Sequence, residues 1–320
     1  MLTYKEKVDP CIAGAAQTVS ADMRPIDLAD HRVLVTGATG LIGRVLVETL
    51  RLRGATVGVC NSEVSLTDCL NWDPTDVIHA AGYAQPAKFT AQAMQTIDLN
   101  TRWLMALVEK VRQNDGRLLY LSTSEVYSGS PRLRHYEADI GQTAPDHPRG
   151  CYIEAKRCGE AIIHAARKDG TKAVAARVSL AYGPGVKKGD TRVVSQFIDQ
   201  ALRSGEIALQ DGGQARRTYC YITDIAEMLL NTVWFGRSPV YNIGGEGEVT
   251  ILSLARRIGG LMKATVKVPR GAGIAQIGAP AHVSLDTGLY RREFSKRHFV
   301  PLEEGLQLTI AWHKALHGIT

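Results

Sequence analysis

The chain has 320 residues, of which 45% are hydrophobic and 22% are charged, a composition that suits one large or two smaller globular domains. Its formal net charge of +6 would attract an anionic ligand, but the basic residues form no long run, which disfavours nucleic-acid binding. No stretch is apolar for long enough to span a membrane and no secretory signal begins the chain, so we expect a cytoplasmic protein without a membrane partner.

The cysteines give no sign of a metal centre or of a disulfide framework. None of them forms a CxxC pair, and their spacing matches no zinc-binding pattern. We therefore expect no metal site and the reduced thiols of a cytosolic protein, at Cys11, Cys60, Cys69, Cys151, Cys158 and Cys220.

The predicted elements change character along the chain. Residues 1–31 form an extension, expected to be a short outer helix or a partly disordered segment, with Pro10 and Pro25 as breaks. In residues 32–180 strands and helices alternate, with strands predicted at 31–36, 55–60, 76–79, 117–121 and 172–177 and helices at 41–53, 88–114 and 151–168. This alternation predicts an α/β fold with a doubly wound, Rossmann-type parallel sheet. Residues 181–320 are expected to form mostly a smaller substrate-binding lobe, from which some segments return to the first domain.

A glycine-rich turn joins the first predicted strand to the first predicted helix. Gly37 permits a tight turn, Gly40 lets the backbone approach a pyrophosphate, and Gly43 lets the helix pack closely on the strand. The start of the helix then offers N–H groups and a partial positive charge to the phosphates. The turn therefore predicts a dinucleotide site formed by Gly37, Thr39, Gly40, Leu41, Ile42 and Gly43.

The residues after the second strand bear on the choice between NAD and NADP. Asn61 can hydrogen-bond a ribose hydroxyl, Glu63 can supply an acidic group, and no arginine follows the strand closely. Asp68 can accept a hydrogen bond from the adenine amine, or it can simply cap a helix. This pattern favours NAD and leaves NADP open.

Three polar side chains suit proton transfer beside a bound nicotinamide. Tyr152 and Lys156 are four residues apart, so they share one face of a helix, and the ammonium is expected to lower the pKa of the phenol. Thr123 ends a strand at the edge of the sheet where ligands bind, and it can relay a proton to Tyr152. Without Thr123 as supporting evidence, the Tyr–Lys pair could instead be exposed on an amphipathic helix and have no function.

These motifs together resemble the extended short-chain dehydrogenase/reductases, specifically the NAD-dependent epimerase/dehydratase family. The resemblance covers most of the chain from residue 32 onward and rests on VTGATGLIG at 35–43, HAAG at 79–82, STSEVY at 122–127, YIEAK at 152–156, YGPG at 182–185, RRTYCYITD at 216–224 and VYNIGGEGEVTILSLA at 240–255. It implies a catalytic triad of Thr123, Tyr152 and Lys156, with Lys156 also holding the nicotinamide ribose. It also implies that Ala80, Ala81 and Gly82 line the cofactor site, that Asn100 braces the central helix and belongs to the cofactor site, and that two helices near 100 and 155 form a homodimer.

The segment after Thr123 bears on the reaction. Its order of Thr, Ser and Glu is closest to UDP-glucuronate decarboxylases, whereas sugar-nucleotide 4,6-dehydratases carry Asp at the position of Ser124. A serine is a poor proton donor at neutral pH, which disfavours elimination of water. Glu125 is a candidate base or ring-orienting acceptor, with a purely structural hydrogen bond as the alternative.

The resemblance also assigns the substrate side of the site. Arg217 corresponds to an arginine that holds the substrate diphosphate, and Arg192 to a nucleotide-contacting position; each could instead be a surface arginine. Leu180 stands where the family has a substrate-contacting Asn, so that contact is lost or supplied by Ser179. The segment from Gly43 to His79 is also shorter than in most decarboxylases and resembles that of NADPH-dependent 4-keto sugar reductases.

The sequence therefore predicts an NAD-dependent enzyme that modifies a nucleotide sugar through a 4-keto intermediate, by decarboxylation or epimerisation. One alternative is an NADPH-dependent 4-keto nucleotide-sugar reductase. Another, of a different class, is an inactive protein that senses NAD(P), although a sensor would need none of the three triad residues.

Overall fold

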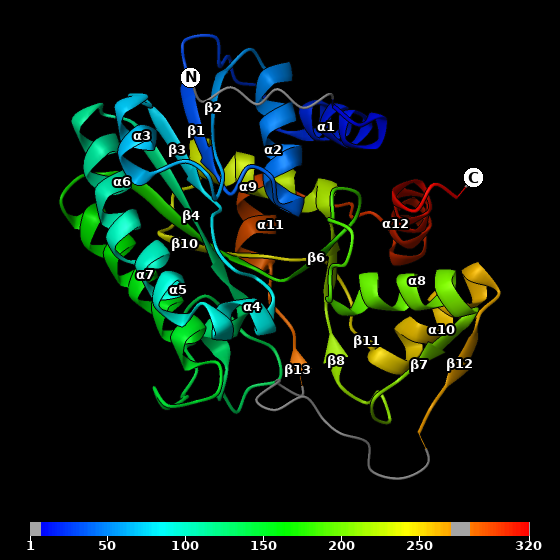
Figure 1. Ribbon diagram of the computed structural model, residues 1–320. Coiled ribbons are helices and arrows are strands. Elements are labelled where there is room, and N and C mark those ends of the chain that lie inside the picture. Colours follow the sequence, from blue (N-terminus) through cyan, green and yellow to red (C-terminus); the bar gives the residue numbers. More distant parts are fainter. Residues whose placement is uncertain (1–7, 270–281, 320) are drawn as a thin grey trace.

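A six-stranded parallel sheet is the centre of the molecule (Figure 1). The computed structural model describes residues 8–269 and 282–319. The strand order is β10-β5-β4-β3-β1-β2, and every neighbouring pair is parallel. The strands are β1 (Arg32–Thr36), β2 (Thr56–Cys60), β3 (Asp76–His79), β4 (Arg117–Thr123), β5 (Lys172–Val178) and β10 (Val240–Ile243). The predicted Rossmann-type fold is confirmed.

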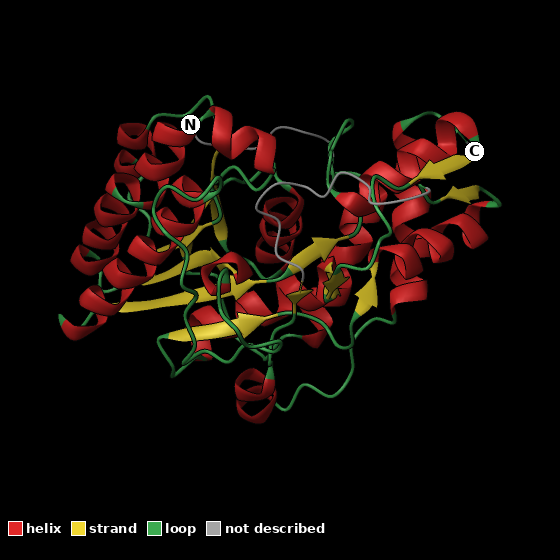
Figure 2. Cartoon of the chain, turned by 90° about the horizontal axis from the view of Figure 1, so that it is seen from below, coloured by secondary structure: helices red, strands yellow, loops and turns green. Residues whose placement is uncertain are grey.

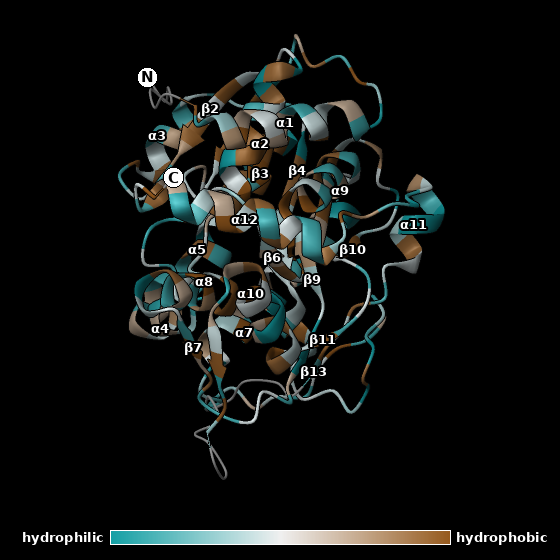
Figure 3. Ribbon diagram, turned by 90° about the vertical axis from the view of Figure 1, so that its right-hand side faces the viewer, coloured by the Kyte–Doolittle hydropathy of each residue, from teal (hydrophilic) through white to brown (hydrophobic). Residues whose placement is uncertain are grey.

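Helices cover both faces of this sheet and form two hydrophobic cores. On one face lie α2 (Leu41–Leu52), α9 (Ile222–Phe235) and the N-terminal α1 (Pro10–Asp22), which pack on one another. On the other face lie α3 (Leu66–Asn71), α6 (Arg102–Gln113) and α7 (Gly150–Lys168). Figure 3 shows that the strands between these layers are mostly hydrophobic, as expected for a sheet that is buried on both sides.

The described part of the N-terminal extension, residues 8–31, contributes to the core. Asp9 caps α1 by accepting a hydrogen bond from the Cys11 N–H, and Pro10 occupies the first turn, where its missing N–H costs nothing. Pro10 therefore marks the start of the expected short helix, and Pro25 follows its end. Ala15 and Val19 are buried in the main core, and α1 packs against α2 and α9.

The second lobe lies beside the sheet, as Figure 2 shows from below. Its helices are α8 (Val193–Ser204) and α10 (Ile251–Met262), and its short strands are β7 (Glu206–Ala208), β8 (Arg216–Arg217), β11 (Val249–Thr250), β12 (Thr265–Lys267) and β13 (His282–Val283). The strands β6 (Leu180–Tyr182) and β9 (Tyr219–Tyr221) pair in parallel between the lobes. The remaining helices after residue 285 are α11 (Gly288–Phe294) and α12 (Leu302–Leu316). Because α9 and β10 belong to the first domain, the chain crosses between the lobes more than once; the boundary at residue 180 stays a prediction.

Two sequence-based expectations are wrong. The single helix predicted at 88–114 is three helices, α4 (Pro86–Ala91), α5 (Ala93–Asn100) and α6, because the backbone leaves the helical conformation at Gln92 and Thr101. The expectation that all cysteines are reduced fails at Cys60 and Cys69, which form a disulfide between the end of β2 and α3. Within residues 8–269 and 282–319, no helix combines the length and apolar character needed to cross a membrane.

Candidate active site

A cleft of about 740 Å³ lies at the carboxyl ends of the main strands, between the sheet and the second lobe. Parallel sheets bind ligands at this edge, next to the point where the strand order reverses, which here is between β1 and β3. The predicted site residues that line the cleft are Ile42, Ala80, Gly82, Thr123, Ser124, Glu125, Tyr152, Lys156, Leu180, Arg192 and Arg217. The structure therefore brings together catalytic, cofactor-side and substrate-side candidates that lie far apart in the sequence.

The glycine-rich turn has the geometry that a dinucleotide requires. Gly37 has a φ of +68°, and a Cβ added there would lie 2.6 Å from the Ala80 carbonyl oxygen. A Cβ on Gly43 would overlap the Gly37 carbonyl, so the first turn of α2 could not pack against the loop. Gly40 is the N-cap of α2 and supplies no side chain to the free N–H groups of that turn, which leaves them available to phosphate oxygens.

A buried hydrogen-bond relay fixes the neighbouring strand end under the turn. The His79 ring bonds the Thr36 hydroxyl at 2.7 Å and the Leu99 carbonyl at 2.9 Å, while the Thr36 oxygen also accepts the Ala81 N–H at 3.1 Å. Burial lowers the pKa of His79 to about 4, so the ring is neutral at physiological pH and can serve both bonds. This relay holds the wall formed by Ala80, Ala81 and Gly82 in place.

Two basic residues that the sequence-based reasoning missed lie at the same turn. Lys187 Nζ lies 3.4 Å from the Thr39 hydroxyl oxygen, and Arg44 Nε donates to the Thr39 carbonyl at 3.2 Å. Their charges add to the partial positive charge at the start of α2. The residues present at this turn thus fit a dinucleotide with a negatively charged pyrophosphate.

The residues expected to recognise the adenosine end of the cofactor are held in local contacts. The Asn61 side chain accepts the Glu63 N–H at 2.9 Å, and the exposed Asp68 bonds the Ser65 hydroxyl, which caps α3, at 2.7 Å. The Cys60–Cys69 disulfide closes this same loop. Ser65, and not Asp68, is therefore the cap of α3, while Asp68 accepts a hydrogen bond from the capping hydroxyl. Cofactor contacts by Asn61 and Asp68 stay predictions.

Asn100 lies behind the cleft and braces it. The residue is fully buried, donates to the Thr96 carbonyl in α5 at 2.6 Å, and accepts the Tyr120 hydroxyl at 2.9 Å. It does not line the cleft. The structure therefore shows a bracing contact at this residue, and direct binding of the cofactor by Asn100 stays a prediction.

Tyr152 projects from the first turns of α7 into the cleft beside Thr123. Its ring stacks on Phe89, with 4.6 Å between the ring centroids and 5° between their planes. Burial, together with the Glu125 carboxylate, raises the pKa of the Tyr152 phenol, while the hydrogen bond with Thr123 opposes that rise. The sequence-based expectation that Lys156 lowers this pKa is therefore wrong for the chain in this structure, because desolvation dominates.

Lys156 lies one helical turn further along α7, and its ammonium faces the sheet. Its Nζ donates to the Leu121 carbonyl at 2.6 Å and lies 4.8 Å from the centroid of the Tyr120 ring, against 5.9 Å for the Tyr152 ring. Burial lowers the pKa of Lys156 to about 7. A Cβ added to Gly82 would lie 3.7 Å from this Nζ, which is an ordinary van der Waals contact, so Gly82 is a near neighbour of the ammonium.

A third missed residue, Arg149, lines the cleft and pairs with Glu125. The Arg149 guanidinium contacts Glu125 Oε1, and both residues are largely buried. The other carboxylate oxygen, Oε2, is buried and has no hydrogen-bond partner within the described part of the chain. Burial raises the pKa of Glu125, while Arg149 and, more weakly, Arg217 lower it. Glu125 thus holds one structural contact and keeps one acceptor for a ligand hydroxyl.

The opposite wall of the cleft combines an apolar side chain with an unsatisfied hydroxyl. Leu180 in β6 lines the cleft, next to Ser179, which is only 7% exposed. The Ser179 hydroxyl is buried and lacks a partner among the residues that the structure describes. Arg192, the N-cap residue of α8, is paired with Asp190 at 2.7 Å and also lines the cleft. Ser179 is thus an open hydrogen-bonding site on the substrate side.

Comparisons with known proteins identify the family of the chain. Residues 33–244 match the model of the NAD dependent epimerase/dehydratase family. UDP-glucuronic acid decarboxylase 6 of Arabidopsis thaliana is 30% identical over 266 residues, which cover 75% of this chain and 77% of that protein.

Solved structures show the same fold at lower identity. MoeE5 in complex with UDP-glucuronic acid and NAD has a TM-score of 0.74 at 24% identity, covering 89% of this chain and 99% of that one. An epimerase from Methanothermobacter thermautotrophicus has a TM-score of 0.80 at 20% identity, covering 95% and 96% of the two chains.

Proposed function

Because the chain belongs to the NAD dependent epimerase/dehydratase family and is an NAD-dependent enzyme, we propose that it decarboxylates a nucleotide-linked hexuronic acid through a 4-keto intermediate. The observation that carries this proposal is the pair Ser124–Glu125 directly after Thr123 in the cleft. Ser124 offers no acid to expel a hydroxyl as water, and Glu125 offers a buried, unsatisfied acceptor beside the triad. Epimerisation at C4 needs the same first step and is the second candidate.

The chain's own residues divide the proton chemistry between them. NAD, when bound, supplies the acceptor for the C4 hydride and later returns it, so the reaction is redox-neutral. Tyr152 takes the proton of the C4 hydroxyl, directly or through Thr123, with which it forms a hydrogen bond. When the C5–C6 bond of the resulting β-keto acid breaks, CO2 leaves and the electron pair of that bond moves onto the C4 oxygen as an enolate, which Thr123 and Tyr152 hydrogen-bond. A proton from solvent then takes the place of the carboxylate on C5, and Tyr152 gives its proton back to the C4 oxygen as the hydride returns to C4. Loss of CO2 therefore needs no acid at the position of Ser124.

The other sequence-based alternatives are less well supported. The family's dependence on NAD disfavours an NADPH-dependent reductase. The triad residues Thr123, Tyr152 and Lys156 line one cleft, and this arrangement would serve no purpose in a sensor without turnover.

Incubation with UDP-, dTDP-, CDP- and GDP-linked hexuronic acids and neutral sugars, read by mass spectrometry, tests the reaction. Loss of CO2 from a hexuronic acid supports decarboxylation. A product of unchanged mass and altered retention identifies an epimerase. Loss of water, or a gain of two hydrogens with NADPH, contradicts the proposal.

We expect Arg217→Ala to raise the KM for the nucleotide sugar by about 10- to 100-fold with a small change in kcat, because a guanidinium–phosphate contact is a strong, charge-assisted bond. Arg217 lines the cleft, whereas its neighbour Arg216 is exposed, so Arg216→Ala is the matched control. Steady-state kinetics of both variants measure the effect. An unchanged KM in Arg217→Ala would remove this residue from diphosphate binding.

We expect Ser179→Ala to raise KM by about 2- to 10-fold, the worth of one neutral hydrogen bond. The variant keeps the fold because the hydroxyl makes no bond within the described residues. The exposed Ser204→Ala in α8 is the control. An equal KM in the two variants would show that Ser179 does not replace the missing asparagine contact.

We also propose a cytoplasmic location and, as a separate point, a homodimer. Exposed apolar side chains support the homodimer. Met94 and Ile97 in α5 are 76% and 37% exposed, and Met105 in α6 is 52% exposed. A group of apolar side chains on neighbouring helices is typical of a surface that another chain covers.

A further inference from the structure

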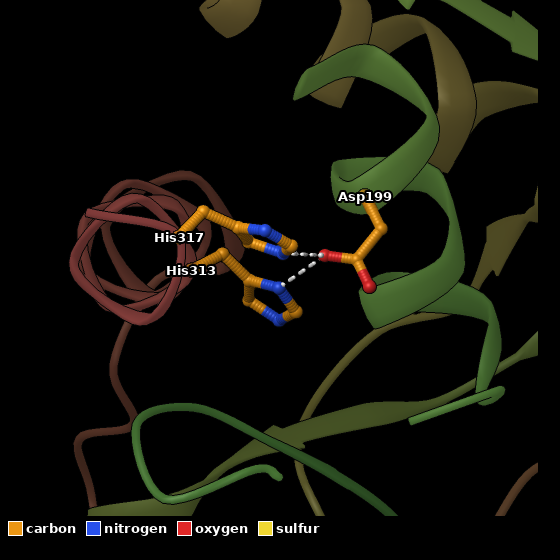
Figure 4. A group of neighbouring side chains, drawn as sticks. All are labelled: Asp199, His313 and His317. Atoms are coloured by element: carbon orange, nitrogen blue, oxygen red, sulfur yellow. Dashed lines mark hydrogen bonds and ion pairs between the residues drawn. The ribbon is translucent and has the colours of Figure 1, made fainter. Parts of the chain in front are cut away.

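A cluster of one carboxylate and two imidazoles lies where α8 and α12 pack together, outside the residues that line the cleft. Asp199 belongs to α8, His313 to α12, and His317 is the C-cap residue of α12 (Figure 4). The four-residue spacing of the histidines places both rings on the face of α12 that packs against α8. In Figure 4 both rings point toward the Asp199 carboxylate.

The three donor groups already converge on one point. His313 Nδ1 lies 2.8 Å and His317 Nε2 lies 3.2 Å from the same carboxylate oxygen, Asp199 Oδ1. One ligand atom from each residue lies within 4.8 Å of the others. Ligands bound to a tetrahedral ion at about 2.0–2.1 Å are roughly 3.4 Å apart, so small side-chain rotations would open the cluster to a cation.

The charge of this cluster also favours a cation. Asp199 is 8% and His313 is 1% exposed, and a buried carboxylate needs a compensating positive charge. The ion pairs found for Asp199 are with the two histidines, which carry charge only when protonated. The nearby Arg203 donates to the Asp199 backbone carbonyl at 3.1 Å and not to its carboxylate.

We propose that Asp199, His313 and His317 bind a divalent transition-metal ion, Zn²⁺ or Co²⁺, with water completing the coordination. Two imidazoles and a carboxylate are a donor set that these ions accept. The expectation of no metal site rested on the spacing of the cysteines. The fold brings Asp199 next to the histidines from more than a hundred positions away in the sequence.

An unsatisfied ring nitrogen of His313 limits the affinity of this site for a metal ion. His313 Nε2 is buried without a partner in the described chain, so coordination through Nδ1 leaves the ring proton on a nitrogen that lacks an acceptor. An unsatisfied buried N–H is costly, and the ion must offset that cost. We therefore expect a dissociation constant near 1 µM, weaker than that of structural zinc sites with four protein ligands.

The metal would act as a clamp between two helices that reach the cleft. Thr309 of α12 lines the cleft, and Trp312 of α12 donates to the Val186 carbonyl at 3.1 Å. The start of α8 carries Arg192, which also lines the cleft. Binding would stabilise the substrate side of the cleft and take no part in the chemistry.

Titration of chelator-treated full-length protein with Co²⁺ and Zn²⁺ tests the proposal. We expect one equivalent of Co²⁺ with visible d–d absorption, competition by Zn²⁺, and a Tm that rises by several degrees at 100 µM metal. His317→Ala is expected to weaken binding about 100-fold. The exposed His298→Ala is the control and should bind like the parent chain.

Asp199→Asn gives a second check because it keeps the size of the side chain and removes its charge. Circular dichroism and NAD binding establish that each variant is folded. Absence of Co²⁺ binding by the parent chain, or binding that survives in folded His317→Ala and Asp199→Asn, would overturn the assignment.

Discussion

Tyr152→Phe is expected to lower kcat by about 100- to 10,000-fold while leaving NAD binding and Tm close to those of the parent chain. The substitution removes the proton-accepting oxygen and keeps the ring that stacks on Phe89. It also removes a buried hydroxyl whose bond is with Thr123, and Thr123 can still accept the Glu125 N–H. The loss should therefore fall on the chemical step and not on the fold.

The pH profile separates a base from a positioning residue. Because the pKa of Tyr152 is raised, the phenolate form is scarce at neutral pH and becomes more abundant as the pH rises. The parent enzyme should therefore gain activity toward alkaline pH, and the residual activity of Tyr152→Phe should lose that limb. Tyr219→Phe, on the opposite wall of the same cleft, is the matched control and should keep the profile. Parent-like turnover in Tyr152→Phe would exclude the phenol from the reaction.

The parts of this site that could be predicted from the sequence are those set by local geometry. The glycine spacing around Gly37 and Gly43 dictates a turn, and a strand before it and a helix after it give that turn its context. The four-residue spacing of Tyr152 and Lys156 likewise fixes their shared helix face. Each of these patterns lies within a few residues, so packing elsewhere cannot undo it.

Contacts between distant segments could not be predicted in this way. Arg149 pairs with Glu125 across 24 positions, and no local pattern marks either residue as the partner of the other. The breaks at Gln92 and Thr101 occur without proline or glycine, so the pattern of apolar residues continues through them. Cys60 and Cys69 meet because β2 and α3 fold back on each other, which cysteine spacing alone does not show.

The error over the Tyr152 pKa has a physical origin in burial. Sequence spacing places an ammonium one turn from a phenol, but it says nothing of how dry their surroundings are. In the structure the ammonium donates to the Leu121 carbonyl, and desolvation raises the pKa of one group while it lowers that of the other. Both shifts disfavour the charged forms, as expected when two ionisable groups share a buried site.

Lys156→Met should lower kcat by about 100-fold or more, because it removes the proposed catalytic ammonium. It should nevertheless raise Tm at pH 7, because the buried positive charge lowers the stability of the folded chain. Its pKa of about 7 lies below its ordinary value of 10.5. Between these two pH values the unfolded chain binds the proton more readily than the folded one. The buried charge therefore destabilises the protein at pH 7 and below, and this destabilisation fades as the pH rises toward 10.5.

Methionine keeps the unbranched apolar stem of the lysine and removes the charge. We expect a gain of roughly 5 °C at pH 6–7, after allowance for the lost bond to Leu121, and a gain near zero by about pH 10. Scanning calorimetry of both proteins across this range measures it, and the exposed Lys168→Met in the same helix should leave Tm unchanged at every pH. A variant that is less stable than the parent at pH 7 would mean that the ammonium, held by Leu121 and the Tyr120 ring, stabilises the fold after all.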